Sequence, residues 1–316
     1  MRTHCAGHED GAKAFGFRPR DIPIPPCHRI GVPMTWLAPA FARSALATAA
    51  FVVAVALPAP AAAASASTTG NDISWPQCGR TFPAGQAFGM VGVTGGLANT
   101  PNPCLGTYQG GSLSTSELYW AWHSTGGSAP GLLPKAALYV NTADPGPGVA
   151  DWPSTNIDPN GNPTASTCTG GDTPACAWQY GWNRAVQDMG WLTQAATGVG
   201  VSSTASAYRW WLDVETANSW ETGTTGLANN VADLQGMVAA FEAAGATVGI
   251  YSTTSQWNQI TSGSKDGNLS GLPDWIPGAR RLSGAQSNCS LPGFTGPVTI
   301  TQWFGKPYDG DYACKV

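Results

Sequence analysis

The chain has 316 residues, with 15 Lys and Arg against 19 Asp and Glu, a net charge of −4 and only 11% charged residues. An acidic chain with so few charges is a poor candidate for binding nucleic acid or an anionic membrane surface. His123 is the only histidine after residue 28, so a zinc site built from several histidines is excluded there, and no G-x-S-x-G motif accompanies it. We expect His123 to be a structural or surface residue.

The first 66 residues are predicted to contain an export signal. An apolar run at 44–57 is followed by small residues that offer cleavage sites after Ala64 or Ala66. The run is too short to span a bilayer comfortably, so we expect no stable membrane anchor after cleavage. The Pro-rich residues before Met34 are unlike the start of a signal peptide, which favours Met34 as the true start. We therefore predict a secreted protein, extracellular or associated with a cell wall.

Residues 67–316 are predicted to form one domain of a size typical of (β/α) barrels. Short apolar runs predict strands at 71–75, 88–94, 136–141, 208–215, 247–252, 274–276 and 298–304. Helical periodicity places Val231, Leu234, Val238 and Phe241 on one face of a helix that Gly245 ends, and a second helix is expected over 177–195. Because strands alternate with helices, the expected fold class is α/β, a TIM-like (β/α) barrel with a mainly parallel sheet.

Cysteines and loops add detail to this prediction. Six cysteines lie in the predicted mature chain: Cys78, Cys104, Cys168, Cys176, Cys289 and Cys314. An even number in an exported chain, with no C-x-x-C pair, favours disulfides over a metal site. We prefer the sequential pairing among 15 possible connectivities, since each such pair brackets a Gly/Pro-rich loop. The Gly/Pro-rich stretch 144–172 is expected to be a long loop at the barrel rim.

The run 208–216 is the most informative part of the chain. It predicts a buried strand that ends in Asp213 and Glu215, which alternation places on one face. Two carboxylates at the end of an apolar strand are costly to desolvate, and they are what acid/base hydrolysis of a glycosidic bond requires. The structural alternative is that such acids cap a following helix or pair with an arginine.

Several short motifs keep the order found in a known family. They are Asn71-Asp-Ile-Ser-Trp75, Trp211-Leu-Asp-Val-Glu215, Gly249-Ile-Tyr-Ser252, Thr301-Gln-Trp303 and Tyr308-Asp-Gly-Asp311. Together they resemble the lysozyme-type muramidases of glycoside hydrolase family 25, and more closely the secreted actinobacterial proteins related to that family. The resemblance implies a glycoside hydrolase that acts on peptidoglycan or a similar amino-sugar polysaccharide, as a monomer without cofactor or metal.

The resemblance also implies roles for individual residues. Asp72, Asp213, Glu215 and Asp309 would lie at the carboxyl ends of barrel strands. Glu215 would be the general acid, Asp213 would support the developing oxocarbenium ion or the acetamido group, and Asp72 and Asp309 would hold the sugar or the attacking water. The expected substrate-binding residues are Trp75, Asn141, Trp220, Tyr251, Gln302, Trp303 and Asp311. Trp257, like Trp75, Trp220 and Trp303, lies at or just after a predicted strand end, where an indole could stack on a sugar ring, but each single one of these tryptophans is more often a large core residue.

The second and third strands depart from the family pattern. Val91-Gly-Val-Thr-Gly-Gly96 carries no charge where the muramidases have a Lys and a Glu, and Asn141-Thr-Ala-Asp-Pro145 lacks their aromatic/His pattern. These differences keep two alternatives open. One is a non-catalytic carbohydrate-binding or envelope-associated protein on the same barrel, and the other is a structural envelope protein with no sugar ligand.

Overall fold

The structure is a computed structural model that describes residues 68–126 and 134–314. The predicted start at Met34, the export signal and its cleavage sites lie outside the described residues. Within the described part of the chain, no helix combines the length and apolar character that crossing a membrane requires.

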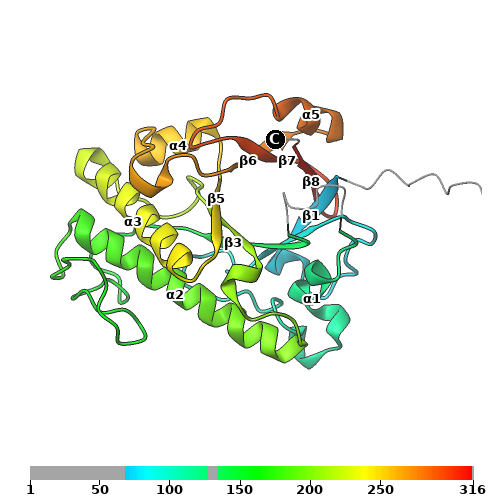
Figure 1. The fold of residues 1–316 in the computed structure, drawn as a ribbon, viewed down its shortest axis with the longest axis horizontal. Coiled ribbons are helices and arrows are strands. Elements are labelled where there is room, and N and C mark those ends of the chain that lie inside the picture. The colour runs from blue at the N-terminus through cyan, green and yellow to red at the C-terminus, as the bar shows by residue number, and fades with distance from the viewer. Residues whose placement is uncertain (1–67, 127–133, 315–316) are drawn as a thin grey trace, which may run out of the picture. The chain divides into compact units, whose positions relative to one another are not determined.

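Eight strands form a closed barrel in sequence order (Figure 1). They are β1 (Thr69–Ile73), β2 (Gly89–Gly92), β3 (Ala136–Asn141), β4 (Arg209–Asp213), β5 (Thr247–Tyr251), β6 (Asp274–Ala279), β7 (Val298–Trp303) and β8 (Asp309–Ala313). Strands β1 to β7 pair in parallel, whereas β8 runs antiparallel to both β7 and β1 and closes the barrel. The predicted α/β barrel is thus confirmed, with one strand, β8, that the apolar pattern did not predict.

The helices lie outside the strands (Figure 1). They are α1 (Glu117–Trp122), α2 (Pro174–Val199), α3 (Gly223–Ala243), α4 (Thr254–Thr261) and α5 (Leu282–Asn288). The two predicted helices correspond to parts of α2 and α3, and Gly245 follows α3 with a φ of +75°. Gly181 of α2 and Gly236 of α3 lie against backbone carbonyls of the other helix, so these two helices pack closely and a side chain at either glycine would collide.

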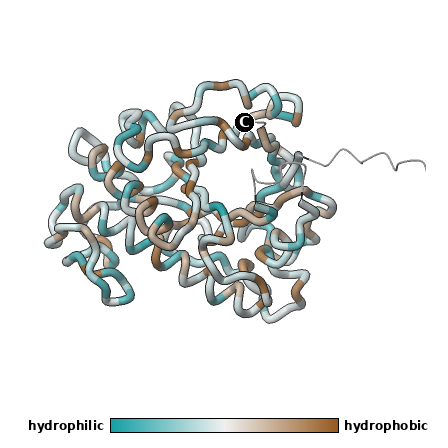
Figure 2. Tube along the Cα trace, viewed as in Figure 1, coloured by the Kyte–Doolittle hydropathy of each residue, from teal (hydrophilic) through white to brown (hydrophobic). Residues whose placement is uncertain are grey.

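Alternation along the strands separates two apolar clusters. Met90, Trp211, Trp275 and Ile300 belong to a cluster inside the barrel. Residues at the alternate positions along the strands, such as Trp210, point outward and pack against the helices. Along the helices, hydrophobic and hydrophilic positions are interspersed (Figure 2), as expected for helices that bury one face.

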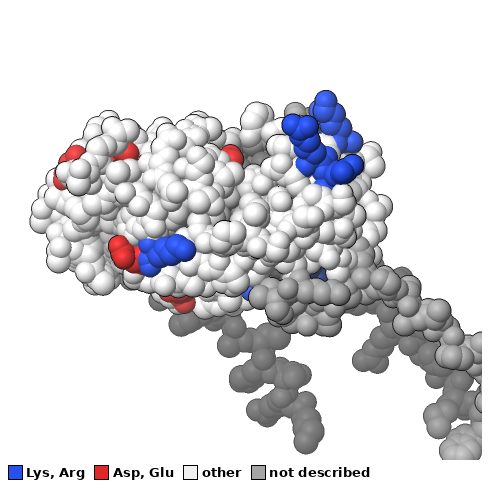
Figure 3. All heavy atoms as spheres, turned by 90° about the horizontal axis from the view of Figure 1, so that it is seen from above, with Lys and Arg blue, Asp and Glu red and all other residues white. Residues whose placement is uncertain are grey.

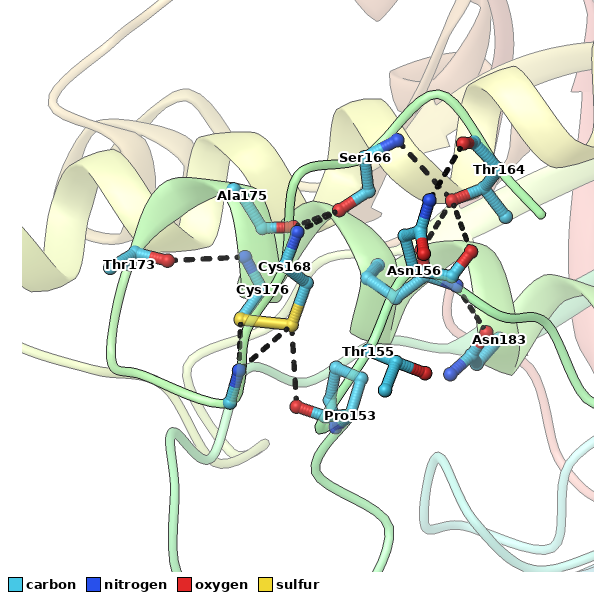
Figure 4. The surroundings of a disulfide bond; sticks show 12 residues. Pro153, Thr155, Asn156, Thr164, Ser166, Cys168, Thr173, Ala175, Cys176 and Asn183 are labelled. Carbon is cyan, nitrogen blue, oxygen red and sulfur yellow. Dashed lines mark hydrogen bonds between the residues drawn. A yellow bond between two sulfur atoms is a disulfide. The ribbon is translucent and has the colours of Figure 1, made fainter.

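Three disulfides join Cys78 to Cys104, Cys168 to Cys176 and Cys289 to Cys314, which confirms the sequential pairing. The loop 144–172 contains no helix or named strand, as predicted. Its end is tied to the first turn of α2 by Cys168–Cys176 (Figure 4), where the Ser166 hydroxyl also donates to the Ala175 carbonyl at 2.8 Å. The long rim loop is therefore fixed to a rigid helix.

Charged side chains are sparse. On the face drawn in Figure 3, most of the Lys and Arg gather at one end, one further basic side chain lies beside an acidic one elsewhere, and a few acidic groups are scattered. Among the residues that the structure describes, Arg184 and Asp151 form the only ion pair, at 3.2 Å. The other described carboxylates therefore have no cation within ion-pair distance.

Candidate active site

Four carboxyl groups come together at the end of the barrel where the parallel strands finish. Asp72 and Asp213 lie at or near the ends of β1 and β4, and Glu215 follows β4 by two residues. Because β8 is antiparallel, its first residue, Asp309, lies at this same end and pairs in register with Asp72. The negative charges of Asp72 and Glu215 both raise the pKa values of Asp213 and Tyr251, so these groups lie near one another. The structure thus brings together the four acids that the sequence singled out.

Asp72 is held by a chain of side chains across the barrel. The Gln302 amide donates to Asp72 Oδ2 at 3.0 Å, and its own oxygen accepts from the Tyr251 hydroxyl at 3.2 Å. Although the residue is only partly buried, its carboxyl group is enclosed by protein atoms. This burial raises the pKa of Asp72 to about 6, the charge of Asp309 acts in the same direction, and the Gln302 hydrogen bond opposes them.

Asp213 is supported by the two strands beside it. The Asn141 amide donates to Asp213 Oδ2 at 2.7 Å, and the orientation of Asn141 is fixed because its oxygen accepts from the Thr94 hydroxyl at 2.9 Å. The backbone N–H of Asn141 donates in turn to the Thr94 oxygen at 2.8 Å. Burial, followed by the charges of Glu215 and Asp72, raises the pKa of Asp213 well above its usual range.

Glu215 is partly exposed, but its backbone is fixed. Its carbonyl accepts from the Trp220 indole at 2.8 Å and from the Asn218 N–H at 3.1 Å. The next N–H, of Thr216, donates to the Gln256 side chain at 2.7 Å. A cavity of about 310 Å³ lies along this β4–α3 connection and is lined in part by Asn218 and Trp220. The more accessible acid of the pair therefore sits on an anchored loop beside a hollow.

The tryptophans separate into rim and core residues. Trp75 is 47% exposed directly after β1, and Trp303 and Trp220 are half-buried. Trp257, in contrast, is completely buried, with its ring 5.5 Å from that of Phe294 and its indole donating to the Ser264 carbonyl. The hypothesis that Trp257 stacks on a sugar is therefore wrong, because its faces are covered by the core.

Two aromatic residues of the site were not predicted from the sequence. Tyr139 precedes Asn141 by two positions on β3 and so faces the same way, and Trp275 is the corresponding inward residue of β6. The Trp275 ring lies 6.0 Å from that of Tyr139 and 4.4 Å from that of Tyr251. Together the three rings form an aromatic layer below the acids. Strand alternation counted back from Asn141 could have identified Tyr139 as well.

His123 is exposed, and its ring packs 4.0 Å from that of Tyr119, which confirms a surface role. In the part of the chain that the structure describes, the side chains spaced closely enough to hold a metal ion are Cys78, Cys104 and Glu117. The two cysteines form a disulfide and offer no thiolate, so this group does not fit a metal.

Comparison with known proteins gives a partial family match. The model of a family described as lysozyme-like protein 1 matches residues 193–275, a segment that contains β4 with Asp213 and Glu215. No curated protein matches the chain.

Solved structures with a similar fold include a muramidase and two lysozymes. A muramidase from Acremonium alcalophilum is 17% identical, with a TM-score of 0.43, 79% of this chain covered and 95% of the other. A family GH25 lysozyme from Aspergillus fumigatus is 18% identical, with a TM-score of 0.44 and coverages of 79% and 94%. A bacterial lysozyme from Streptomyces coelicolor is 14% identical, with a TM-score of 0.41 and coverages of 78% and 91%.

Proposed function

We propose that this protein is a secreted glycoside hydrolase that cleaves glycosidic bonds of peptidoglycan, or of a related amino-sugar polysaccharide, by carboxylate acid/base catalysis. The observation that carries the proposal is the meeting of Asp72, Asp213, Glu215 and Asp309 at one end of the barrel. Structural carboxylates are normally paired with a cation, and none of these four has such a partner among the described residues. The lysozyme-like family match over residues 193–275 supports the same reaction class.

In this proposal the Asp213 and Glu215 pair supplies the proton. Because Asp213 is buried beside the charge of Glu215, Asp213 retains a proton at a pH where an isolated carboxyl group would have lost it. Glu215 is the more accessible member, so we assign to it the transfer of a proton to the glycosidic oxygen. Asp213, oriented by Asn141, stabilises the positive charge that develops on the sugar. Asp72 and Asp309 hold the attacking water or a sugar hydroxyl.

Two further features support a polymeric sugar outside the cell. Trp75 is an exposed indole three residues after Asp72, suited to stacking on the apolar face of a sugar ring. Three disulfides are typical of an exported domain, in agreement with the export signal proposed for the first 66 residues. We propose that the mature protein acts as a monomer, extracellular or associated with a cell wall.

The proposal is tested with Glu215→Gln, which keeps the shape and hydrogen bonding of the side chain but removes the transferable proton. Hydrolysis of purified peptidoglycan, measured as released reducing ends, should fall by about 10² to 10⁴-fold, the usual contribution of a general acid. Binding to insoluble peptidoglycan should survive. Glu242→Gln, on the exposed surface of α3, is the matched control and should retain full activity.

The outcomes separate the alternatives. A wild-type protein that binds peptidoglycan but releases no reducing ends between acidic and neutral pH would be the non-catalytic carbohydrate-binding protein. Neither binding nor hydrolysis would favour a structural envelope protein. Equal hydrolysis by wild type and Glu215→Gln would show that another group is the acid.

A further inference from the structure

Asp311 is a fifth carboxylic acid, located beneath the proposed site. It is fully buried in the middle of β8, opposite Gln302 of β7 and Gly70 of β1. On β1, Asp72 is the diagonal neighbour of Asp311, because Asp72 pairs with Asp309 two positions earlier on β8. The sequence predicted that Asp311 binds substrate, whereas its burial places it behind Asp72.

The surroundings of Asp311 favour its neutral form. Neither of its oxygens accepts a hydrogen bond of normal geometry among the described residues, although the Trp275 side chain lies close enough to oppose the rise in its pKa. The titratable and polar groups around it are Asp72 from β1, Asp309 from β8, Tyr251 from β5 and Trp275 from β6, none of which is a cation. An ionised carboxylate that is buried without a cation is very costly, and binding a proton removes that cost. Burial and the charge of Asp72 raise the pKa of Asp311 well above its usual range.

The proton on Asp311 has a natural acceptor. Asp72 lies within hydrogen-bonding reach of Asp311. Gln302 occupies Oδ2 of Asp72, which leaves Oδ1 for a second donor. The Gln302 amide cannot turn round without losing the bond that its oxygen accepts from Tyr251. Two fixed donors, Gln302 and the protonated Asp311, would then hold the Asp72 carboxylate from behind.

We propose that Asp311 is a positioning residue that keeps its proton and donates it in a hydrogen bond to Asp72, so that Asp72 faces the site as an oriented acceptor. The catalytic part of this inference rests on the proposed hydrolase function, but the protonation state does not. In this arrangement Asp311 acts through Asp72 and does not contact the substrate. An amide at position 311 can donate in the same way, whereas an alanine cannot.

The first experiment counts protons and needs no activity. A buried Asp that is neutral in the native state ionises on unfolding above pH about 4, so the unfolding equilibrium releases a proton. From urea unfolding of the full chain with its disulfides intact, at several pH values between about 5 and 7, Asp311→Asn should release about one proton fewer than wild type. Glu242→Gln should release as many as wild type. An unchanged proton count in Asp311→Asn would overturn the inference.

The second experiment measures the effect on the reaction. Loss of a hydrogen bond to a charged group should lower hydrolysis in Asp311→Ala by about tenfold or more, and Asp311→Asn should restore most of it, to within about threefold of wild type. An Asn variant as defective as the Ala variant would overturn the role as a donor. If Ala fails to fold, the proton count of the Asn variant still decides the protonation state. A wild-type protein without hydrolytic activity would refute the proposed function and leave that count as the test of Asp311.

Discussion

Asp72→Asn should make the protein more stable at neutral pH and less active. The folded structure raises the pKa of Asp72 from 3.8 to about 6, mainly by burial. Each pKa unit corresponds to about 1.36 kcal/mol, so ionising Asp72 at pH 7 costs the native state about 2 to 3 kcal/mol. The native state binds more protons than the unfolded state between pH about 4 and 6. The neutral form therefore stabilises the fold fully below pH about 4, and this stabilisation is lost as the pH rises through 6.

An asparagine at position 72 carries no charge, so the native state no longer bears the cost of ionising this buried group. Its amide oxygen can still accept the hydrogen bond from the Gln302 amide. Urea unfolding should show a free energy of unfolding about 2 to 3 kcal/mol higher for Asp72→Asn than for wild type at pH 7, with the difference gone near pH 3. Peptidoglycan hydrolysis at pH 7 should fall by at least about tenfold, because the acceptor charge is lost. A variant no more stable than wild type at pH 7 would refute the argument that burial makes this carboxylate costly.

Two further predictions concern stability alone. Burial raises the pKa of Glu117 to about 8, and the hydrogen bond from Asn102 opposes this rise. The neutral form of Glu117 therefore stabilises the fold below pH about 4.5, and this stabilisation is lost as the pH rises toward 8. Measured by urea unfolding, the free energy of unfolding of Glu117→Gln should exceed that of wild type by about 3 kcal/mol at pH 7 and equal it near pH 3. Replacing Cys289 and Cys314 by alanine should cost about 3.5 kcal/mol, against about 2.5 kcal/mol for Cys168 and Cys176, since the bridges span 25 and 8 residues. Equal losses would contradict the loop-entropy explanation.

Much of the site could be predicted because strands have a period of two. The D-x-E pair follows an apolar run, so alternation predicts Asp213 and Glu215 on one face; in the structure Asp213 ends β4 and Glu215 lies two residues beyond it. The predicted cysteine pairing also holds, because the paired cysteines are neighbours along the chain, separated by 26, 8 and 25 residues. These inferences need only neighbours in the sequence, which a single chain displays directly.

The parts that sequence analysis missed depend on contacts between distant segments. Strand β8 was missed because it begins Asp-Gly-Asp, a sequence typical of a turn. In the structure the two acids face the barrel interior, and Gly310 makes room for the Trp303 ring. The support of Asp213 by Thr94 requires the register between β2 and β3, which no local pattern gives. The sequence leaves both roles of Trp257 open, because an indole after a strand end has the same sequence pattern whether the core covers it or not.

Closure of the barrel by β8 has a consequence for the order in which the protein can mature. The Asn71 side chain donates to the Asp309 carbonyl across 238 positions of sequence, and the N–H of Ala313 donates to the carbonyl of Thr68. The hydrogen bonds between β1 and β8 therefore form only when the last strand has docked, and contacts of such long range form slowly. Until the carboxyl-terminal residues have been synthesised and docked, the nascent chain has Asp213 and Glu215 but lacks the opposite wall that carries Asp309 and Asp311. A nascent chain of this topology thus lacks part of the proposed site at every length short of the closed barrel.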